Sequence, residues 1–204
     1  SPEAQLIGAV NTVLNDNGKL IGYNTDGYGF MQSVRDAGHD ITGKNITVMG
    51  VGGASMAICA QSALDGAASV HIFARRTSRY WNRTQKFAEN LSAKTGCQVC
   101  LFDNDDHTAL RDSIAQSYLL INATSVGMVP DIDDTIIKDT SLFHPELVVA
   151  DVVYEPQETR LLREAKAAGC QTFNGMYMLL HQGAKAFQIW TGQEMPVSVI
   201  KEKY

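Results

Sequence analysis

A glycine-rich turn in the first third of the chain has the residues and spacing of a dinucleotide-binding loop. The run Gly50-Val51-Gly52-Gly53-Ala54-Ser55 follows a short apolar segment and precedes an alanine-rich one. In a strand–turn–helix context, the first glycine permits the tight turn and the second lets the backbone approach a pyrophosphate. The free N–H groups and the dipole of the helix N-terminus favour that anion. A glycine-rich turn without a ligand is the alternative, and the position of the next predicted strand favours the dinucleotide loop.

A basic stretch follows that next strand, at the position that recognises the adenosine ribose. NAD enzymes usually carry Asp or Glu there, which accepts a hydrogen bond from the ribose 2′-hydroxyl. This chain has the run Ala74-Arg75-Arg76-Thr77-Ser78-Arg79 instead. Guanidinium groups form bidentate hydrogen bonds with phosphate. The run therefore favours the 2′-phosphate of NADP over NAD, and the alternative is a basic, solvated helix start.

Asn11 and Asp26 are a third candidate set. Asn11 and the run Asn24-Thr25-Asp26-Gly27 lie at the ends of two predicted hairpin strands, so both can project polar side chains to one rim. Two interpretations of Asp26 stay open at this point: a functional carboxylate and an N-cap of the next helix, a position that Asp fills well. Spacing alone favours the cap.

Cys97 and Cys100 form a C-x-x-C pair, which is found in zinc sites and redox centres. No second pair and no H-x-x-x-H accompanies it, and the pair lies in an apolar, strand-like run. We therefore interpret both as structural core residues and predict no metal site. With no signal peptide at the start, the cytoplasm is the expected compartment.

The composition argues against two other classes of function. The net charge is −5, whereas a nucleic-acid-binding domain carries a basic stripe or patch. The longest apolar runs, such as residues 147–150, are far too short to span a bilayer.

Strands and helices alternate through most of the chain, which predicts a parallel, doubly wound α/β sheet covered on both faces. Ahead of it, residues 9–14 and 19–24 predict two strands around an Asn-Gly turn, and the strand-like pattern begins within a few residues of Ser1. Two helical stripes flank the sheet, at residues 30–37 and 176–190. The expected strands are residues 46–49, 69–74, 98–102, 118–122, 147–151 and 171–173, and the expected helices are residues 55–64, 81–93, 108–115 and 159–168.

The order of these motifs resembles the shikimate dehydrogenase family. The glycine loop and the runs around Asn11 and Asp26 are joined by three further matching runs, at residues 121–128, 151–159 and 175–183. Together they span nearly the whole chain and are very specific. Residues 187–192 resemble most closely the branch that acts on quinate as well as shikimate.

The resemblance implies substrate roles for four residues. Asp26 matches the family's catalytic aspartate, which works with a lysine to move the proton of the reacting ring hydroxyl. Asn11 and Gln182 match ligands of the substrate hydroxyls, and Tyr154 matches a residue near the substrate.

The resemblance also implies cofactor roles. Residues 50–54 match the pyrophosphate loop, and Ser125, Val152 and Gly175 match positions that line the nicotinamide. Thr77 stands where the quinate branch can carry an acid, and this departure argues against a preference for NAD.

The resemblance implies a catalytic lysine and substrate-binding serines upstream of the Asn11 motif. The 204 residues contain no match to them, and the chain has the character of a piece of a longer polypeptide. We expect this chain alone to be inactive. A nucleotide-binding fragment without catalysis is therefore one alternative, and a different dehydrogenase, acting on folate or on glutamyl-tRNA, is another that lacks the Asn-Thr-Asp-Gly match.

The expected fold is a Rossmann-like doubly wound parallel sheet with remnants of a smaller α/β substrate domain. We expect a substrate-domain remnant at residues 1–29, a dinucleotide-binding domain at 30–175 and C-terminal helices returning to the substrate domain at 176–204. The expected activity is reversible, NADP- or NAD-dependent hydride transfer between shikimate, quinate or both and the 3-dehydro acid, within aromatic amino-acid biosynthesis. The expected partner is that small ring hydroxy acid, and a homodimer is compatible with the sequence.

Overall fold

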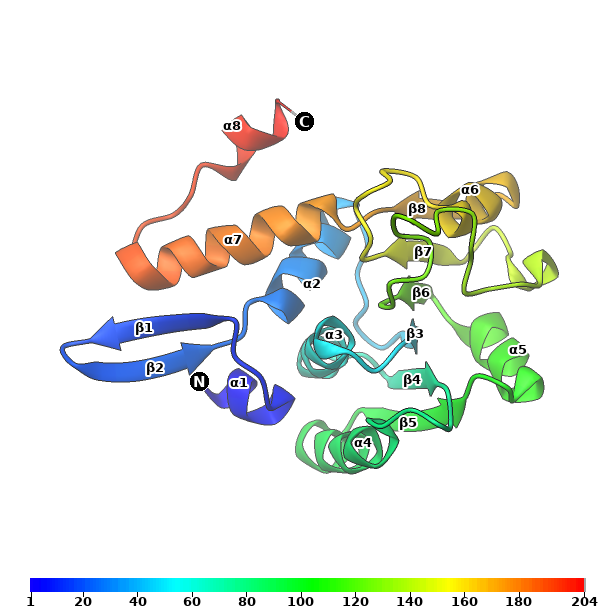
Figure 1. Ribbon diagram of the computed structural model, residues 1–204, viewed down its shortest axis with the longest axis horizontal. Coiled ribbons are helices and arrows are strands. Elements are labelled where there is room, and N and C mark those ends of the chain that lie inside the picture. The colour runs from blue at the N-terminus through cyan, green and yellow to red at the C-terminus, as the bar shows by residue number, and fades with distance from the viewer. Residues whose placement is uncertain (204) are drawn as a thin grey trace.

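A six-stranded parallel sheet forms the centre of the computed structural model, which describes residues 1–203 (Figure 1). The strand order is β5-β4-β3-β6-β7-β8, so the chain runs outward from β3 in one direction and then returns to its other side. This reversal is the doubly wound topology predicted from the alternating elements. The strands are β3 (Asn45–Met49), β4 (Ser69–Ala74), β5 (Gln98–Asp103), β6 (Leu119–Asn122), β7 (Val148–Asp151) and β8 (Gln171–Phe173).

Alternate residues of the central strands enter two separate cores, one on each face of the sheet. In β6, Leu119 and Ile121 belong to one core and Leu120 to the other. Because successive strand side chains point to opposite faces, a sheet covered on both sides needs apolar residues at nearly every position. The first core packs under α2 (Asp26–Asp36), α3 (Gly53–Leu64) and α4 (Trp81–Thr95), and the second under α5 (His107–Gln116) and α6 (Arg160–Ala167) (Figure 1).

The predicted hairpin lies outside this sheet. Strands β1 (Thr12–Asp16) and β2 (Lys19–Tyr23) pair antiparallel, and Asn17 and Gly18 form the turn with φ of 51° and 92°. Positive φ at both turn residues matches the twist of the strands, which explains the Asn-Gly sequence.

The first residues form a helix, α1 (Pro2–Ile7), so the strand-like pattern expected there was wrong. The Ser1 hydroxyl accepts a hydrogen bond from the Ala4 N–H at 3.2 Å, and Gly8 ends the helix with φ of 73°. These cap contacts, with the proline near the helix start, outweigh the alternation of a very short apolar run.

Helix α7 (Met176–Thr191) packs across α2 at a contact that has no room for a side chain. A Cβ on Gly29 would lie 2.7 Å from the Gln182 nitrogen and 2.7 Å from the Met178 oxygen. At its far end α2 is tied to α7 and to α8 (Val197–Lys201), because the Asp36 carboxylate bonds both His181 and Lys201. Burial alone would raise the pKa of Asp36, but the hydrogen bonds from Lys201 and His181 outweigh it and hold that pKa below its ordinary value.

The described cysteines are free; Cys97 is buried as predicted, whereas Cys100, also predicted in the core, is only half-buried. Burial raises the pKa of Cys97 to about 11 and that of Cys59 to about 12, so both thiols stay protonated at neutral pH. In residues 1–203, no cluster of three or more His, Cys, Asp or Glu side chains is arranged to hold a metal ion. No helix in this range has the length and apolar character needed to cross a membrane. The division of the chain at residues 29 and 175 stays a prediction.

Two helical glycines give a matched test of the α2–α7 contact. Gly29→Ala forces a methyl group into backbone atoms, and we expect a loss of about 1–3 kcal/mol in the free energy of unfolding. Gly183, in α7, has open space at its Cβ position. Gly183→Ala should therefore stabilise the protein by roughly 0.5–1 kcal/mol through the lower entropy of the unfolded chain. Urea unfolding measures both, and a gain in stability for Gly29→Ala would contradict the contact.

Candidate active site

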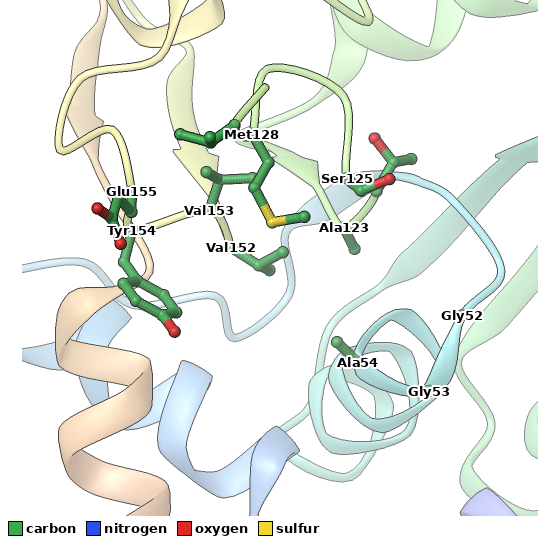
Figure 2. Close-up of a pocket in the computed structure, with 12 residues that line it drawn as sticks. Gly52, Gly53, Ala54, Ala123, Ser125, Met128, Val152, Val153, Tyr154 and Glu155 are labelled. Atoms are coloured by element: carbon green, nitrogen blue, oxygen red, sulfur yellow. The ribbon is translucent and has the colours of Figure 1, made fainter. Parts of the chain in front are cut away.

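Two clefts open at the carboxyl edge of the sheet, on either side of the glycine loop that joins β3 to α3. The first cleft, of about 860 Å³, is lined by the glycine loop and by the segments after β4 and β6. The second cleft, of about 460 Å³, is lined by the start of α3 and by the segments after β6 and β7 (Figure 2). In doubly wound folds this edge, at the point where the strand order reverses, is where ligands bind.

The glycine loop leaves open space before the N-terminus of α3. Gly50 has φ of 112°, and a Cβ there would lie 2.8 Å from the Thr124 side chain, so the turn requires glycine. A Cβ on Gly52 or Gly53 would meet no atom within 4 Å. The cradle therefore fits a pyrophosphate, which the helix N-terminus would attract. Ser55 stands where the motif usually has Gly or Ala. Its buried hydroxyl donates to the Gly50 carbonyl oxygen at 2.6 Å, so the serine is accommodated within the turn.

The structure brings part of the predicted basic stretch to the first cleft. Ala74, Arg75, Thr77 and Arg79 line it, and the two arginines are exposed. Arg76 does not line this cleft, since its guanidinium lies 4.6 Å from the centre of the Trp81 ring.

Asn104 also lines the first cleft, and sequence analysis missed it. Its side-chain oxygen is buried and has no hydrogen-bond partner among the described residues. The signal was its position just after β5, because carboxyl ends of parallel strands share one edge of the sheet.

Three of the predicted residues line the second cleft, and one lies behind it. Ser125, Val152 and Tyr154 are on its surface, and Figure 2 shows the Tyr154 ring extending from the segment after β7. Gly175 is not on the surface. A Cβ at Gly175 would lie 2.0 Å from the Val152 carbonyl oxygen, so this glycine lets α7 begin directly against the cleft wall.

The predicted substrate residues Asn11, Asp26 and Gln182 come together around Thr25. The Asn11 amide donates to the Asp26 carboxylate at 2.8 Å and to the Thr25 hydroxyl at 3.0 Å, and its oxygen accepts from the Thr25 N–H at 3.0 Å. The Thr25 hydroxyl lies 3.4 Å from the Gln182 side-chain oxygen. Thr25 is 1% exposed and joins residues that are more than 150 positions apart in sequence, a role that its place in the Asn-Thr-Asp-Gly run did not reveal.

Asp26 is not the helix cap that spacing favoured. It is the first residue of α2, Thr25 occupies the cap position, and the Asp26 carboxylate faces Asn11. Burial raises the pKa of Asp26, and the hydrogen bond from Asn11 partly opposes this rise. In residues 1–203 no lysine or arginine forms an ion pair with Asp26. The half-buried carboxylate is therefore available to a further donor.

Comparison with known proteins identifies the family. Residues 175–203 match the family model of the Shikimate 5'-dehydrogenase C-terminal domain. The chain is 52% identical to the shikimate dehydrogenase (NADP(+)) of Listeria innocua over 202 residues, which is 99% of this chain and 69% of that protein. The chain belongs to the shikimate dehydrogenase family. The resemblance noted from the sequence is thus confirmed.

Two further relatives extend this result. The chain is 42% identical to the quinate/shikimate dehydrogenase of Escherichia coli, over 99% of this chain and 70% of that protein. The crystal structure of shikimate 5-dehydrogenase from Listeria monocytogenes in complex with shikimate and NAD matches with a TM-score of 0.96 at 51% identity, covering 100% of this chain and 70% of that one. The match confirms the α/β fold.

Proposed function

We propose that this chain forms the dinucleotide-binding part of a dehydrogenase that interconverts shikimate, quinate or both with the 3-dehydro acid. The observation that carries the proposal is the hydrogen-bonded set of Asn11, Thr25, Asp26 and Gln182. It combines one carboxylate, one hydroxyl and two amides, which suits a small polyhydroxylated acid. The two clefts beside the glycine loop support a dinucleotide as the second reactant.

In this mechanism Asp26 acts on the reacting ring hydroxyl. Its carboxylate accepts a hydrogen bond from that hydroxyl and stabilises the protonated form of the lysine that takes the proton. The resemblance assigns that lysine to the part of the enzyme upstream of Asn11. When bound, the nicotinamide donates or accepts the hydride. General acid–base help of this kind contributes roughly 10²–10⁴-fold to the rate.

Asn11 and Gln182 orient the substrate in this proposal. Asn11 is exposed, and its amide fixes the Asp26 carboxylate and the Thr25 backbone at the same time. The Gln182 amide donates to the Leu179 carbonyl oxygen at 3.1 Å, which holds it on the same rim for a ring hydroxyl.

The proposed preference for NADP rests on Arg75, Thr77 and Arg79. Two exposed guanidinium groups and a hydroxyl line the first cleft, and no carboxylate is among its lining residues. These groups suit a phosphate better than a free ribose hydroxyl. We further propose that the enzyme acts in the cytoplasm and forms a homodimer. A fragment that binds nucleotide without catalysis remains the alternative for these 204 residues alone.

Removing two cleft arginines should change the choice of cofactor. In Arg75→Ala combined with Arg79→Ala, we expect the affinity for NADP to fall at least about tenfold, since a hydrogen bond to a charged group is worth about 1.5–3 kcal/mol. The affinity for NAD should hardly change. Arg76→Ala is the matched control, because Arg76 carries the same charge but does not line the first cleft. Titration with each dinucleotide measures the effect, and an equal loss for both would show that the arginines only support the loop.

Replacing the carboxylate of Asp26 should remove activity without loss of stability. We expect Asp26→Asn in the full-length enzyme to lower kcat by roughly 10²-fold or more, because an amide cannot stabilise the protonated lysine. A variant with near-normal kcat would remove Asp26 from the catalytic machinery.

The effect of this substitution on stability follows from the pKa of Asp26. Because the pKa is raised in the folded state, ionisation costs the folded protein free energy once the pH exceeds the unfolded value of about 3.9. The neutral amide removes this cost, so the Tm of Asp26→Asn at neutral pH should equal or exceed that of the wild type. The difference in Tm between Asp26→Asn and the wild type should vanish as the pH falls below about 4, because Asp26 is then protonated in both the folded and the unfolded state. Thermal melts of the 204-residue chain across pH make this measurement, because in its described residues no lysine or arginine pairs with Asp26.

A further inference from the structure

A fully buried carboxylate lies at the carboxyl end of β7, between the two segments that form the second cleft. Asp151 has 0% exposure. One carboxylate oxygen accepts from the Asn122 amide and from the Val153 N–H, each at 3.0 Å, and the other accepts from the Thr159 hydroxyl at 2.8 Å. All three partners are donors, which favours the charged carboxylate, although burial raises the pKa of Asp151.

The network continues from Asn122 into the segment after β6. Asn122 pairs in register with Asp151 and is itself fully buried. Its amide nitrogen also donates to the Val126 carbonyl oxygen at 3.1 Å, and its oxygen accepts from the Thr124 hydroxyl at 2.6 Å. Residues 122–126 are thus closed into a turn by one side chain, which Asp151 in turn holds.

Both walls of the second cleft therefore depend on one carboxylate. Ser125 lies on the turn that Asn122 closes, and Val152 and Val153 directly follow Asp151. Thr159, the third partner, caps α6 through the Leu162 N–H. Figure 2 shows Ser125 on the segment after β6, and Val152 and Val153 on the segment after β7.

Stability alone is a poor reason for this arrangement. Taking a charge fully out of water is costly, and apolar residues of similar volume often replace buried charged groups without loss of stability. A network centred on a charge instead fixes the positions of its partners, because each hydrogen bond forms only within a narrow range of distances and angles.

We propose that Asp151 is a positioning residue for hydride transfer, because it sets the spacing and orientation of the two walls that receive the nicotinamide ring. This inference rests on the proposed function. Asp151 does not line the cleft, so it acts through Ser125 and Val152.

The test compares NADP, which would occupy both clefts, with adenosine 2′,5′-bisphosphate, which would occupy only the first. In full-length Asp151→Asn, the amide nitrogen replaces either the oxygen that accepts from the Thr159 hydroxyl or the oxygen that accepts from Asn122 and Val153, so at least one donor loses its acceptor. This loss, together with the loss of the charge, shifts the walls while nearly preserving the side-chain volume. We expect kcat to fall at least about tenfold, since small misplacements of reacting groups are costly. The affinity for NADP should fall several-fold and clearly more than that for adenosine 2′,5′-bisphosphate, which lacks the nicotinamide end, because the first cleft shares the turn at residues 123–125 with the second but not Val152 or Val153. Titration calorimetry gives both affinities.

Leu91→Ala is the control for a general loss of stability. Leu91 is a fully buried residue of α4 in the first core and lines neither cleft. This variant should have a lower Tm than the wild type but the same kcat and the same ratio of the affinities for NADP and for the bisphosphate. If Asp151→Asn behaves like Leu91→Ala, or weakens both ligands equally, the positioning role is overturned.

A second variant covers the case in which Asp151→Asn fails to fold. Thr159→Val removes one donor to Asp151 and keeps the other two, so the same split between NADP and the bisphosphate should appear at a smaller size. Thr159→Ser, which retains the hydroxyl, should behave like the wild type. If Thr159→Val shows no split between the two affinities, or Thr159→Ser shows the same split, the proposal is overturned. If the wild-type enzyme turns over no ring acid, the proposed function fails, while the affinity ratio still tests whether Asp151 shapes the second cleft.

Discussion

The close packing of α2 between α3 and α7 is the contact on which both halves of the site depend. A Cβ on Gly27 would lie 2.4 Å from the Ala57 carbonyl oxygen in α3, and a Cβ on Gly29 would lie 2.7 Å from the backbone of α7. Only glycine permits helices to approach in this way. Since α2 begins at Asp26, α3 begins at the glycine loop and α7 carries Gln182, these two contacts fix the Asp26 carboxylate relative to both the Gln182 side chain and the glycine loop.

The two ends of α2 each carry an aspartate, and the two carboxylates lie in different electrostatic surroundings. Asp26 lies at the N-terminus of α2, where the helix dipole favours an anion, and burial opposes its ionisation. Asp36, at the other end of α2, is held in its charged form by Lys201 and His181. His181 precedes Gln182, so the Asp36 carboxylate that anchors α8 also fixes the turn of α7 that contacts Thr25. One end of α2 is thus available for chemistry while the other is neutralised.

Local signals predicted the elements well, and contacts between distant segments account for what was missed. The Asn17-Gly18 turn, the buried strands and the glycine loop each depend on a few adjacent residues, so they could be recognised in the sequence. The helix at residues 2–7 was missed because its cap contacts outweigh a short apolar pattern. The stacking of Arg76 on Trp81 and the position of Gly175 behind Val152 are tertiary contacts that spacing cannot reveal. Spacing also favoured a cap role for Asp26, and only the tertiary contact of Asn11, just before β1, with the start of α2 brings its amide to the Asp26 carboxylate.

The most direct test of the account is the rate of nicotinamide reduction by the full-length protein, measured with shikimate and with quinate, each paired with NADP and with NAD. The account predicts reduction of NADP by at least one of the two acids, with NADP used more efficiently than NAD. A folded, full-length protein that reduces neither cofactor with either acid would contradict the proposed function.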